Sequence, residues 1–292
     1  MSTINVNVQT LASAQRLGSI NNLLGQSLSR LSSGLRLTSP SSDPAAVGSI
    51  SKLEAQDKRA QAASINVQNA ASFVQSSSGF LSSMGGLITR MSELSQYAAD
   101  SIKNPSERAL YQLEFKQLQD QLRQTIGGTT AEIGGTTDIN KPLGSFNSIT
   151  LYGPNPSGIS IASSSHAGDN INIPATNLRD GAMLDIFKQD SSGNYLLAAT
   201  DPSSIDKISL ALNDIADEQS VLGGVDSRLE LAAGSLAVES QNIGAAVSRI
   251  QDTDVAMEST RLTKLNILLE SGTAMLSQAN QAPQAVLQLL QR

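Results

Sequence analysis

The dominant feature of the chain is an apolar position at every seventh residue over a long stretch that contains no proline. Between residues 53 and 102 only one member of this series, Ser95, is polar. A seven-residue period keeps one face of a long helix apolar only when the helix supercoils around partner helices. The stretch is therefore predicted to be a rod helix, with contacts at Leu53, Ala60, Val67, Val74, Leu81, Ile88 and Ile102.

A second series with the same period lies far downstream and identifies the partner helix. It has no polar member between residues 208 and 250. Neither stretch can hide its apolar stripe from water alone, so the two are predicted to pack on each other and to bring the chain ends together. Rod packing is then expected at Leu81, Ile88, Leu222, Leu229, Leu236 and Ile243.

The first 42 residues place leucines and isoleucines three or four positions apart, which is the spacing of an amphipathic helix. Pro40 and Pro44 interrupt that helix, while Asp43 can cap a new one that begins with Pro44. The rod helix should therefore begin near residue 44. Because this N-terminal segment carries arginines and no acid, an organelle transit peptide and a helix lying on a membrane surface are alternatives.

Cap signals predict two further helices. The run Asn104-Pro105-Ser106-Glu107 supplies a cap, a first-turn proline and a capping-box acid. The rod helix should therefore end near Lys103, and the next helix should run to Gly127-Gly128 and fold back on it. Asp201-Pro202 gives the same signal for the helix that carries the second series.

Residues 128–200 have a different character, because Gly, Thr, Ser, Asn and Pro separate short alternating apolar runs. Such runs occur at residues 148–152, 158–161 and 170–173. Alternation bounded by turn residues is typical of strands and hairpins. The predicted fold class is therefore mainly α: a long coiled-coil rod, formed as an antiparallel bundle of N- and C-terminal helices, with a small β-hairpin region in the middle of the chain.

Composition agrees with long helices and excludes several classes of site. The 292 residues include five Phe, four Tyr, no Trp and no Cys, and the net charge is −6. Without cysteine there is neither a disulfide nor a thiolate metal site, and without a basic stripe we expect no nucleic-acid partner. We also expect no membrane span and no cofactor, and the N-terminus lacks the pattern of a cleaved signal peptide.

The sequence offers only weak candidates for a catalytic site. His166 is the only histidine, so a Ser-His-acid hydrolase is an alternative that depends on this one residue. No HExxH motif and no phosphate-binding loop is present. Asp252 and Asp254 flank a threonine but lack the remaining ligands of a calcium loop, so a polar helix end is favoured there. We therefore predict no enzyme and no metal site.

Three motifs, in order along the chain, resemble bacterial flagellins. RLSSGLR at residues 30–36 is similar to their N-terminal signature, SRIQDTD at 248–254 to a stretch before their last helix, and SQANQAPQAVLQLLQR at 277–292 to their C-terminal signature. Phe146-Asn147 also matches the family, although Ser148 stands in place of the usual glycine. The resemblance implies a short flagellin without outer domains, in which residues 128–200 are the whole variable insert.

The resemblance implies a structural subunit that polymerises into the flagellar filament for swimming, exported without a cleaved signal peptide. It implies contacts with copies of itself, an export chaperone, filament-cap proteins and hook-associated proteins. Residues 87–95 resemble the segment recognised by the flagellin-sensing Toll-like receptor, which assigns recognition to Arg90, Leu94 and Glu114. A hook-associated protein at the hook-filament junction and a membrane-surface amphipathic protein are the alternatives.

Both ends of the chain are predicted to form the polymerising part. The domains expected are 1–42 with 255–292 as inner terminal helices, 43–127 with 201–254 as the rod, and 128–200 as a β-rich insert of the rod. We expect the ends to order only when neighbouring subunits cover them, and Pro283 to kink the last helix or start a new one. The predicted polymerisation contacts are Leu17, Ile20, Leu24, Leu28, Leu31, Leu265, Leu269, Leu287 and Leu290.

Overall fold

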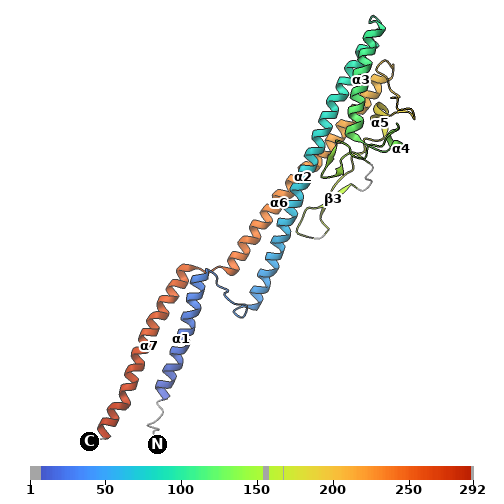
Figure 1. The fold of residues 1–292 in the computed structure, drawn as a ribbon. Helices are drawn as coiled ribbons and strands as arrows, with labels where there is room; N and C mark the ends of the chain where they lie inside the picture. Colours follow the sequence, from blue (N-terminus) through green and yellow to red (C-terminus); the bar gives the residue numbers. More distant parts are fainter. Residues whose placement is uncertain (1–7, 154–157, 167, 291–292) are drawn as a thin grey trace. The chain divides into compact units, whose positions relative to one another are not determined.

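A computed structural model describes residues 8–153, 158–166 and 168–290, and long helices dominate it (Figure 1). The chain divides into two compact units, one formed by residues up to Asp57 together with those from Gln241 onward, and the other by Lys58–Ser240. The elements are α1 Val8–Ser33, α2 Pro44–Ala99, α3 Pro105–Ile126, α4 Thr130–Ile133, β1 Ser145–Phe146, β2 Ile149–Thr150, β3 Ile159–Ala162, β4 Asn170–Ile173, α5 Gly181–Phe187, α6 Ser204–Gln251 and α7 Val255–Leu290.

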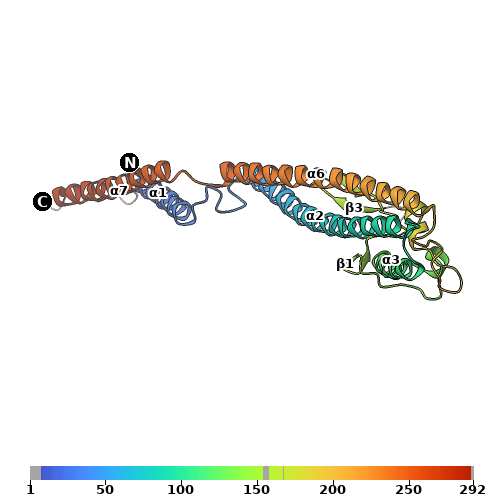
Figure 2. The same ribbon diagram turned by 90° about the horizontal axis from the view of Figure 1, so that it is seen from above.

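In the unit Lys58–Ser240, α2 and α6 lie side by side and antiparallel (Figure 2). A Cβ atom added at Gly85 of α2 would lie 3.9 Å from Cγ2 of Ile215 on α6. Arg59 of α2 and Glu239 of α6 both bind Ser165 of the insert. Arg59 Nε donates to the Ser165 carbonyl over 3.1 Å, and the Ser165 hydroxyl donates to Glu239. The predicted antiparallel rod with a small β region is therefore confirmed.

The two heptad series form the core between these helices. Side chains of both series are buried to 3% exposure or less within this unit, from Ala60 to Ile88 on α2 and from Ile208 to Leu236 on α6. At roughly 2 kcal/mol for each large apolar side chain removed from water, this burial is the main favourable contribution to the stability of the rod.

The start of α2 follows the predicted cap, but its end does not. Asp43 Oδ1 accepts a hydrogen bond from the backbone N–H of Ala46 over 3.0 Å, and Pro44 is the first helical residue. At the other end the helix stops at Ala99, and Ile102 is 92% exposed rather than part of the seam. The reason is local: the Asp100 side chain accepts from the N–H of Ile102 over 3.0 Å and replaces a helical hydrogen bond.

Helix α3 folds back along α2, as predicted. The Asn104 and Glu107 capping box forms with hydrogen bonds of 2.9 and 3.2 Å, and Gly127 ends the helix at a φ of 66°. Arg108 Nε donates to the carbonyl of Ala98 over 2.9 Å, and Phe115 is fully buried in the rod core. The first turn and the end of this helix are thus fixed by residues within the segment itself.

Helix α6 begins two residues later than predicted, and α7 does not end at the predicted interruption. Asp201 accepts hydrogen bonds from the N–H and hydroxyl of Ser203, so Pro202 lies in a turn that precedes the helix. Helix α7 is continuous from Val255 to Leu290 and does not break at Pro283.

The insert contains the predicted strands but also two helices that the sequence did not reveal. Strand β1 pairs with β2, and β3 pairs with β4, both antiparallel. Helices α4 and α5 are only four and seven residues long, and α5 buries Met183, Ile186 and Phe187. Helices this short carry too few residues for a periodic pattern, so tertiary packing decides them.

Buried Gln119 of α3 attaches the insert to the rod. Its Nε2 atom donates to the carbonyl of Ile186 over 2.7 Å and to that of Leu197 over 2.9 Å, and the side chain is fully buried. Two carbonyls of the insert therefore share one amide group of α3.

Replacing Gln119 by alanine should destabilise this unit by about 2–3 kcal/mol, because two buried carbonyls lose their donor and a cavity forms. Urea unfolding followed by circular dichroism measures the change. Gln121→Ala, at an exposed position of the same helix, is the matched control. Equal midpoints for the two variants would contradict this role of Gln119.

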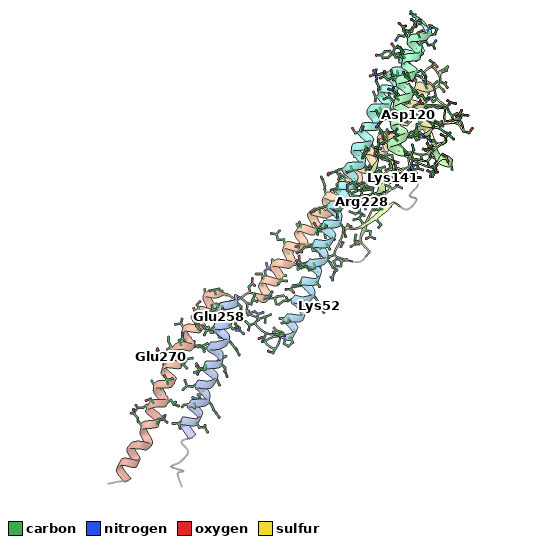
Figure 3. The ribbon with its side chains drawn as sticks, viewed as in Figure 1. Lys52, Asp120, Lys141, Arg228, Glu258 and Glu270 are labelled. Carbon is green, nitrogen blue, oxygen red and sulfur yellow. The ribbon has the colours of Figure 1, made fainter. Side chains whose placement is uncertain are left out.

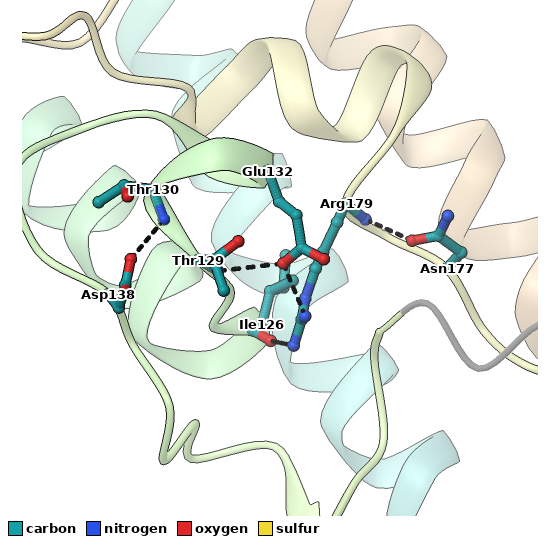
Figure 4. Close-up of polar contacts among 7 residues, drawn as sticks. All are labelled: Ile126, Thr129, Thr130, Glu132, Asp138, Asn177 and Arg179. Atoms are coloured by element: carbon teal, nitrogen blue, oxygen red, sulfur yellow. Dashed lines mark hydrogen bonds and ion pairs between the residues drawn. The ribbon is translucent and has the colours of Figure 1, made fainter.

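A second anchor joins α4 to the segment before α5 (Figure 4). Arg179 donates to Glu132 Oε2 over 3.1 Å and to the carbonyl of Ile126 over 3.2 Å. The same Glu132 oxygen accepts from the backbone N–H of Thr129 over 3.0 Å. The Thr129 hydrogen bond first, and Arg179 in addition, lower the pKa of Glu132 below its ordinary value.

This lowered pKa predicts acid sensitivity. A carboxyl whose pKa is lower in the folded than in the unfolded chain stabilises the fold above the unfolded value, and that contribution is lost as the pH falls through the folded value. The free energy of unfolding should therefore fall between about pH 5 and about pH 3, and Glu132→Gln should fall less steeply. Urea titrations at several pH values measure the slopes. An unchanged slope in Glu132→Gln, beside the exposed control Glu230→Gln, would count against this assignment.

The turn between β1 and β2 has a strained residue. Asn147 and Ser148 have φ angles of 47° and 65°, in the left-handed region. Asparagine tolerates this conformation, whereas serine has no such preference.

Ser148→Gly should therefore stabilise the protein by about 1 kcal/mol, because glycine adopts a positive φ without steric cost. The expected result is a higher urea midpoint. Ser191→Gly is the control, since Ser191 is exposed and its φ is not positive, so this change should be neutral or slightly destabilising. Equal effects of the two substitutions would show that the turn is not strained.

Candidate self-assembly surface

The terminal helices α1 and α7 pack against each other in antiparallel directions within the first unit. Ser27 of α1 donates a hydrogen bond of 2.5 Å to Glu258 of α7, and the two residues are only 2% and 7% exposed. Glu258 is labelled on its helix in Figure 3. Near the middle of the pair, Leu17 lies beside Gly272. A buried carboxylate with a hydroxyl partner fixes the register of two helices that otherwise meet through aliphatic side chains.

The helices approach closely at one glycine, where a larger residue would require the Leu17 side chain to shift. A Cβ atom added at Gly272 would lie 2.9 Å from Cδ2 of Leu17, which is closer than van der Waals contact allows. By contrast, nothing lies within 4 Å of a Cβ added at Gly18 or Gly25 on α1. Gly272 therefore belongs to the paired face, and the other two glycines lie away from it.

The segments that follow α1 and α6 are joined to each other in this unit. The N–H of Arg36 donates to the carbonyl of Gln251 over 2.7 Å, and that of Thr253 to the carbonyl of Gly34 over 2.9 Å. The Arg36 guanidinium also donates to the carbonyl of Ile250 over 2.8 Å. The motifs RLSSGLR and SRIQDTD, far apart in the sequence, thus meet in a short antiparallel bridge.

The junction is short because capping residues end α1 and begin α7 close to it. Gly34 ends α1 at a φ of 72°, and Asp254 accepts from the N–H groups of Ala256 and Met257 to start α7. Asp252 accepts a hydrogen bond from the hydroxyl of Ser248. No cluster of His, Cys, Asp or Glu suited to a metal occurs in the described part of the chain.

The predicted polymerisation residues lie in different environments. Leu265 is 7% exposed and faces the helix pair, whereas Leu28 is 48% exposed. The side chains of Leu287 and Leu290 lie outside the described residues. The remaining members are partly buried in α1 and α7: Leu17, Ile20, Leu24, Leu31 and Leu269.

Apart from Leu28, sequence reasoning missed a set of apolar side chains that remain exposed after α1 and α7 have paired. On α7 the spacing of Met257, Leu268 and Met275 by eleven and seven residues places them on one helix face. The seven-residue spacing between Leu268 and Met275 was the sequence signal that could have found part of this set. The set, here called the outer apolar set, comprises Leu11, Leu23, Leu28, Met257, Ile267, Leu268 and Met275, each at least 37% exposed.

Comparisons with known proteins bear on this arrangement. The family description "Bacterial flagellin N-terminal helical region" matches residues 4–132, and "Bacterial flagellin C-terminal helical region" matches residues 205–290. The flagellar filament 33 kDa core protein of Treponema phagedenis is 32% identical, over 98% of this chain and 99% of its own length. The chain belongs to the flagellin family.

Other members of the flagellin family are similar over the same span. The flagellins of Halalkalibacterium halodurans and of Bacillus subtilis strain 168 are each 30% identical, over 98% of this chain and 99% of theirs. Among solved structures, a putative flagellar hook-associated protein from Vibrio parahaemolyticus matches 73% of this chain and 97% of that one, at 15% identity and a TM-score of 0.42. So distant a likeness does not distinguish a filament protein from a junction protein.

The matched helical regions include every residue predicted for rod packing. Leu81, Ile88, Leu222, Leu229 and Leu236 are 3% exposed or less in the unit Lys58–Ser240. Ile243 is 6% exposed and belongs to the other unit. These side chains are therefore in position for packing within one flagellin chain.

Of the three residues assigned to receptor recognition, two have exposed side chains and one is buried. Arg90 makes ion pairs of 2.8 Å with Glu114 and with Glu93, and all three side chains are more than 40% exposed. Leu94 is fully buried in the rod core and is not accessible to a partner in this structure. The structure thus brings Arg90 and Glu114 together but corrects the expectation that Leu94 is a surface contact.

The arrangement around His166 does not form a catalytic triad. Ser165 donates to Glu239, and its hydroxyl lies 3.2 Å from Nδ1 of the exposed His166. In a triad the carboxylate orients the histidine, whereas here it binds the serine, which is itself 5% exposed. The flagellin family is a family of structural proteins, and these residues connect the insert to α2 and α6.

No helix within the described ranges is both long enough and apolar enough to cross a membrane.

Proposed function

We propose that this chain is a structural subunit that polymerises into the extracellular bacterial flagellar filament and so serves swimming motility. The observation that carries the proposal is the outer apolar set: seven large apolar side chains stay exposed on α1 and α7 although these helices already cover each other. Large apolar side chains that share a helix face and stay exposed favour an interaction site. Membership of the flagellin family makes further copies of the same chain its partner.

The polymer would form by a heterologous contact, in which one surface of a subunit meets a different surface of the next. Such contacts give an open helical array when the rotation between copies does not close a ring. In this proposal residues 1–42 and 255–292 line the inner tube, residues 43–127 and 201–254 form the rod around it, and residues 128–200 are an insert of the rod. The outer apolar set would be covered by terminal helices of neighbouring copies.

The terminal helices are proposed to order during assembly. Large apolar side chains on both faces of α1 and α7 mean that one intramolecular contact buries only part of their surface. Ordering each residue costs on the order of 1–2 kcal/mol, which partial burial offsets poorly. Limited proteolysis of dilute monomer should cleave both ends, and the polymer should resist. Protected ends in the monomer would contradict this part of the proposal.

Electron microscopy of the purified protein after salting out or seeding tests the main proposal. Long, uniform filaments are expected, and a chain that stays monomeric under all such conditions would overturn it. Short caps or rings that join only to filaments of another protein would instead support a hook-associated role.

Export without a cleaved signal peptide, with help from a chaperone, cap proteins and hook-associated proteins, is the route that we propose from the family. Cells carrying the gene should release the chain with its N-terminal residues intact, as mass spectrometry of shed filaments can measure. A shortened N-terminus would contradict this route.

Recognition by the flagellin-sensing Toll-like receptor is proposed for the exposed Arg90 and Glu114 pair. Arg90→Ala should reduce receptor binding by monomer, while Lys116→Ala, an exposed cation on the same hairpin, should not. Binding measured by surface plasmon resonance distinguishes the two variants. Equal affinities would remove Arg90 from the proposed contact.

A further inference from the structure

The unit Lys58–Ser240 contains an apolar pocket between α2 and the two hairpins. Its volume is about 390 Å³, and its large apolar lining residues are Phe73, Phe146, Ile149, Ile159, Ile161 and Ile173, together with the smaller Ala70 of α2. Two uncharged amides, Asn69 and Asn147, complete its polar part, and no charged residue contributes to the lining. A pocket with this lining accepts an aliphatic or aromatic side chain and disfavours a charged one.

The walls of the pocket are held in place. Phe73 and Phe146 meet edge to face, with ring centroids 5.8 Å apart, and β3 pairs with β4 along four residues. Ile173 is 1% exposed, whereas Ile149 at the rim is 44% exposed. The pocket therefore exists in the single chain and opens at the β1-β2 hairpin.

A matching apolar side chain lies on the surface of the same unit. Ile102, in the turn after α2, is 92% exposed, the highest value among the large apolar residues described. The turn is ordered by Asp100, which accepts from the N–H of Ile102 over 3.0 Å. Lys103 lies over the rings of Tyr97 and Tyr111, 4.8 and 4.4 Å from their centroids.

These contacts fix the backbone on both sides of Ile102 and leave its side chain in water. A partner that covers this side chain would gain the favourable free energy of removing it from water. Because the turn is already ordered, little conformational entropy would be lost when the partner binds.

We propose that Ile102 of one copy inserts into the pocket of a second copy in the assembled polymer. The proposal rests on the proposed function and adds one specific contact between rods. An exposed apolar side chain that fits a pocket elsewhere on the same molecule gives a heterologous contact, which propagates instead of closing. Along α2 the pocket at Ala70 and the helix end at Ala99 are separated by about 45 Å at 1.5 Å per residue, so neighbouring rods would be staggered by about that distance.

A second copy fits these observations better than a small ligand does. The polar side chains at the pocket are two amides without a charge, so little there would orient a small polar molecule. The exposed isoleucine that matches the pocket is present in every subunit at the same concentration as the pocket itself.

The absence of cysteine in the sequence allows a direct test. Full-length protein carrying both Ile102→Cys and Ile149→Cys is assembled in reductant and then oxidised. A ladder of covalent oligomers is expected on a non-reducing gel, and each single variant should give none. Ile102→Cys with Leu231→Cys, at a position 75% exposed on α6, is the matched control.

The outcomes separate this inference from the proposed function. If wild-type protein forms no filaments, the proposed function fails. If filaments of the Ile102 and Ile149 double variant form but give no ladder, or if the control pair gives the same ladder, the contact proposed here is wrong. Ile102→Glu should in addition raise the critical concentration for assembly at least about tenfold, equal to 1.4 kcal/mol, while monomer circular dichroism stays unchanged. If Ile102→Glu assembled at the same critical concentration as the wild-type protein, the proposed contact would also be wrong.

Discussion

Replacing Leu265 by aspartate should abolish filament formation and leave the unit Lys58–Ser240 folded. Leu265 is 7% exposed where α7 meets α1. The substitution removes about 2 kcal/mol of apolar burial and places an unpaired carboxylate in the same site, which costs several kcal/mol more. A helix pair of this length cannot retain its register against that cost, so the surface offered to neighbouring copies is lost.

Electron microscopy and sedimentation of the salted-out protein measure assembly, and circular dichroism of the monomer measures the helices of the rod. Asn266→Asp is the matched control, because it introduces the same charge at the adjacent, exposed position of α7. This control should polymerise. Filaments formed by Leu265→Asp at the wild-type concentration would show that the α1 and α7 interface is dispensable.

Replacing Leu229 by aspartate should unfold the rod itself. Leu229 of α6 is fully buried within the core cluster that α6 shares with α2. An ionised carboxylate there has no described partner, and the cost of burying it is comparable to the whole stability of a typical domain, about 5–15 kcal/mol. The expected result is loss of cooperative urea unfolding and a large loss of helical signal.

Leu231 provides a control two residues away on the same helix. It is 75% exposed, so Leu231→Asp introduces the same chemistry into water and should change the unfolding free energy of monomer by less than about 0.5 kcal/mol. Similar midpoints for the Leu229 and Leu231 variants would mean that the heptad series on α6 does not hold the rod together.

The structure gives the family motifs a physical explanation. RLSSGLR and SRIQDTD resemble flagellin signatures, yet neither sequence alone says why its residues are needed. In the fold, Gly34 turns the chain after α1, and Arg36 binds backbone groups of Ile250 and Gln251. The two motifs are therefore halves of one junction. Substituting Arg36 removes the guanidinium hydrogen bond to Ile250, whereas the backbone bond to Gln251 does not depend on the side chain.

The errors in the sequence-based predictions have a common physical origin. Ile102 continues the heptad of α2, but Asp100 ends the helix first and leaves the isoleucine exposed. Leu94 lies in a segment that resembles a receptor contact, but its side chain is fully buried in the rod core. Each of these side chains is apolar and could lie either in the core or on the surface. The packing of the folded chain decides which.

What the sequence determined by itself is the helical rod and most of its limits. The heptad series from Ala60 to Ile88 and from Ile208 to Leu236 required two long helices, and the caps at Asp43 and Asn104 set where helices begin. These features depend on residues close in the chain or on a strict period. Short-range hydrogen bonds and helix geometry are encoded locally.

Only the tertiary structure decided the contacts that join distant segments: Gln119 with the insert, Ser27 with Glu258, and the glycine approach at Gly272. It also decided which apolar side chains remain on the surface after the helices pair. These outcomes follow from three-dimensional packing, because burial of a side chain depends on neighbours that the local sequence does not contain.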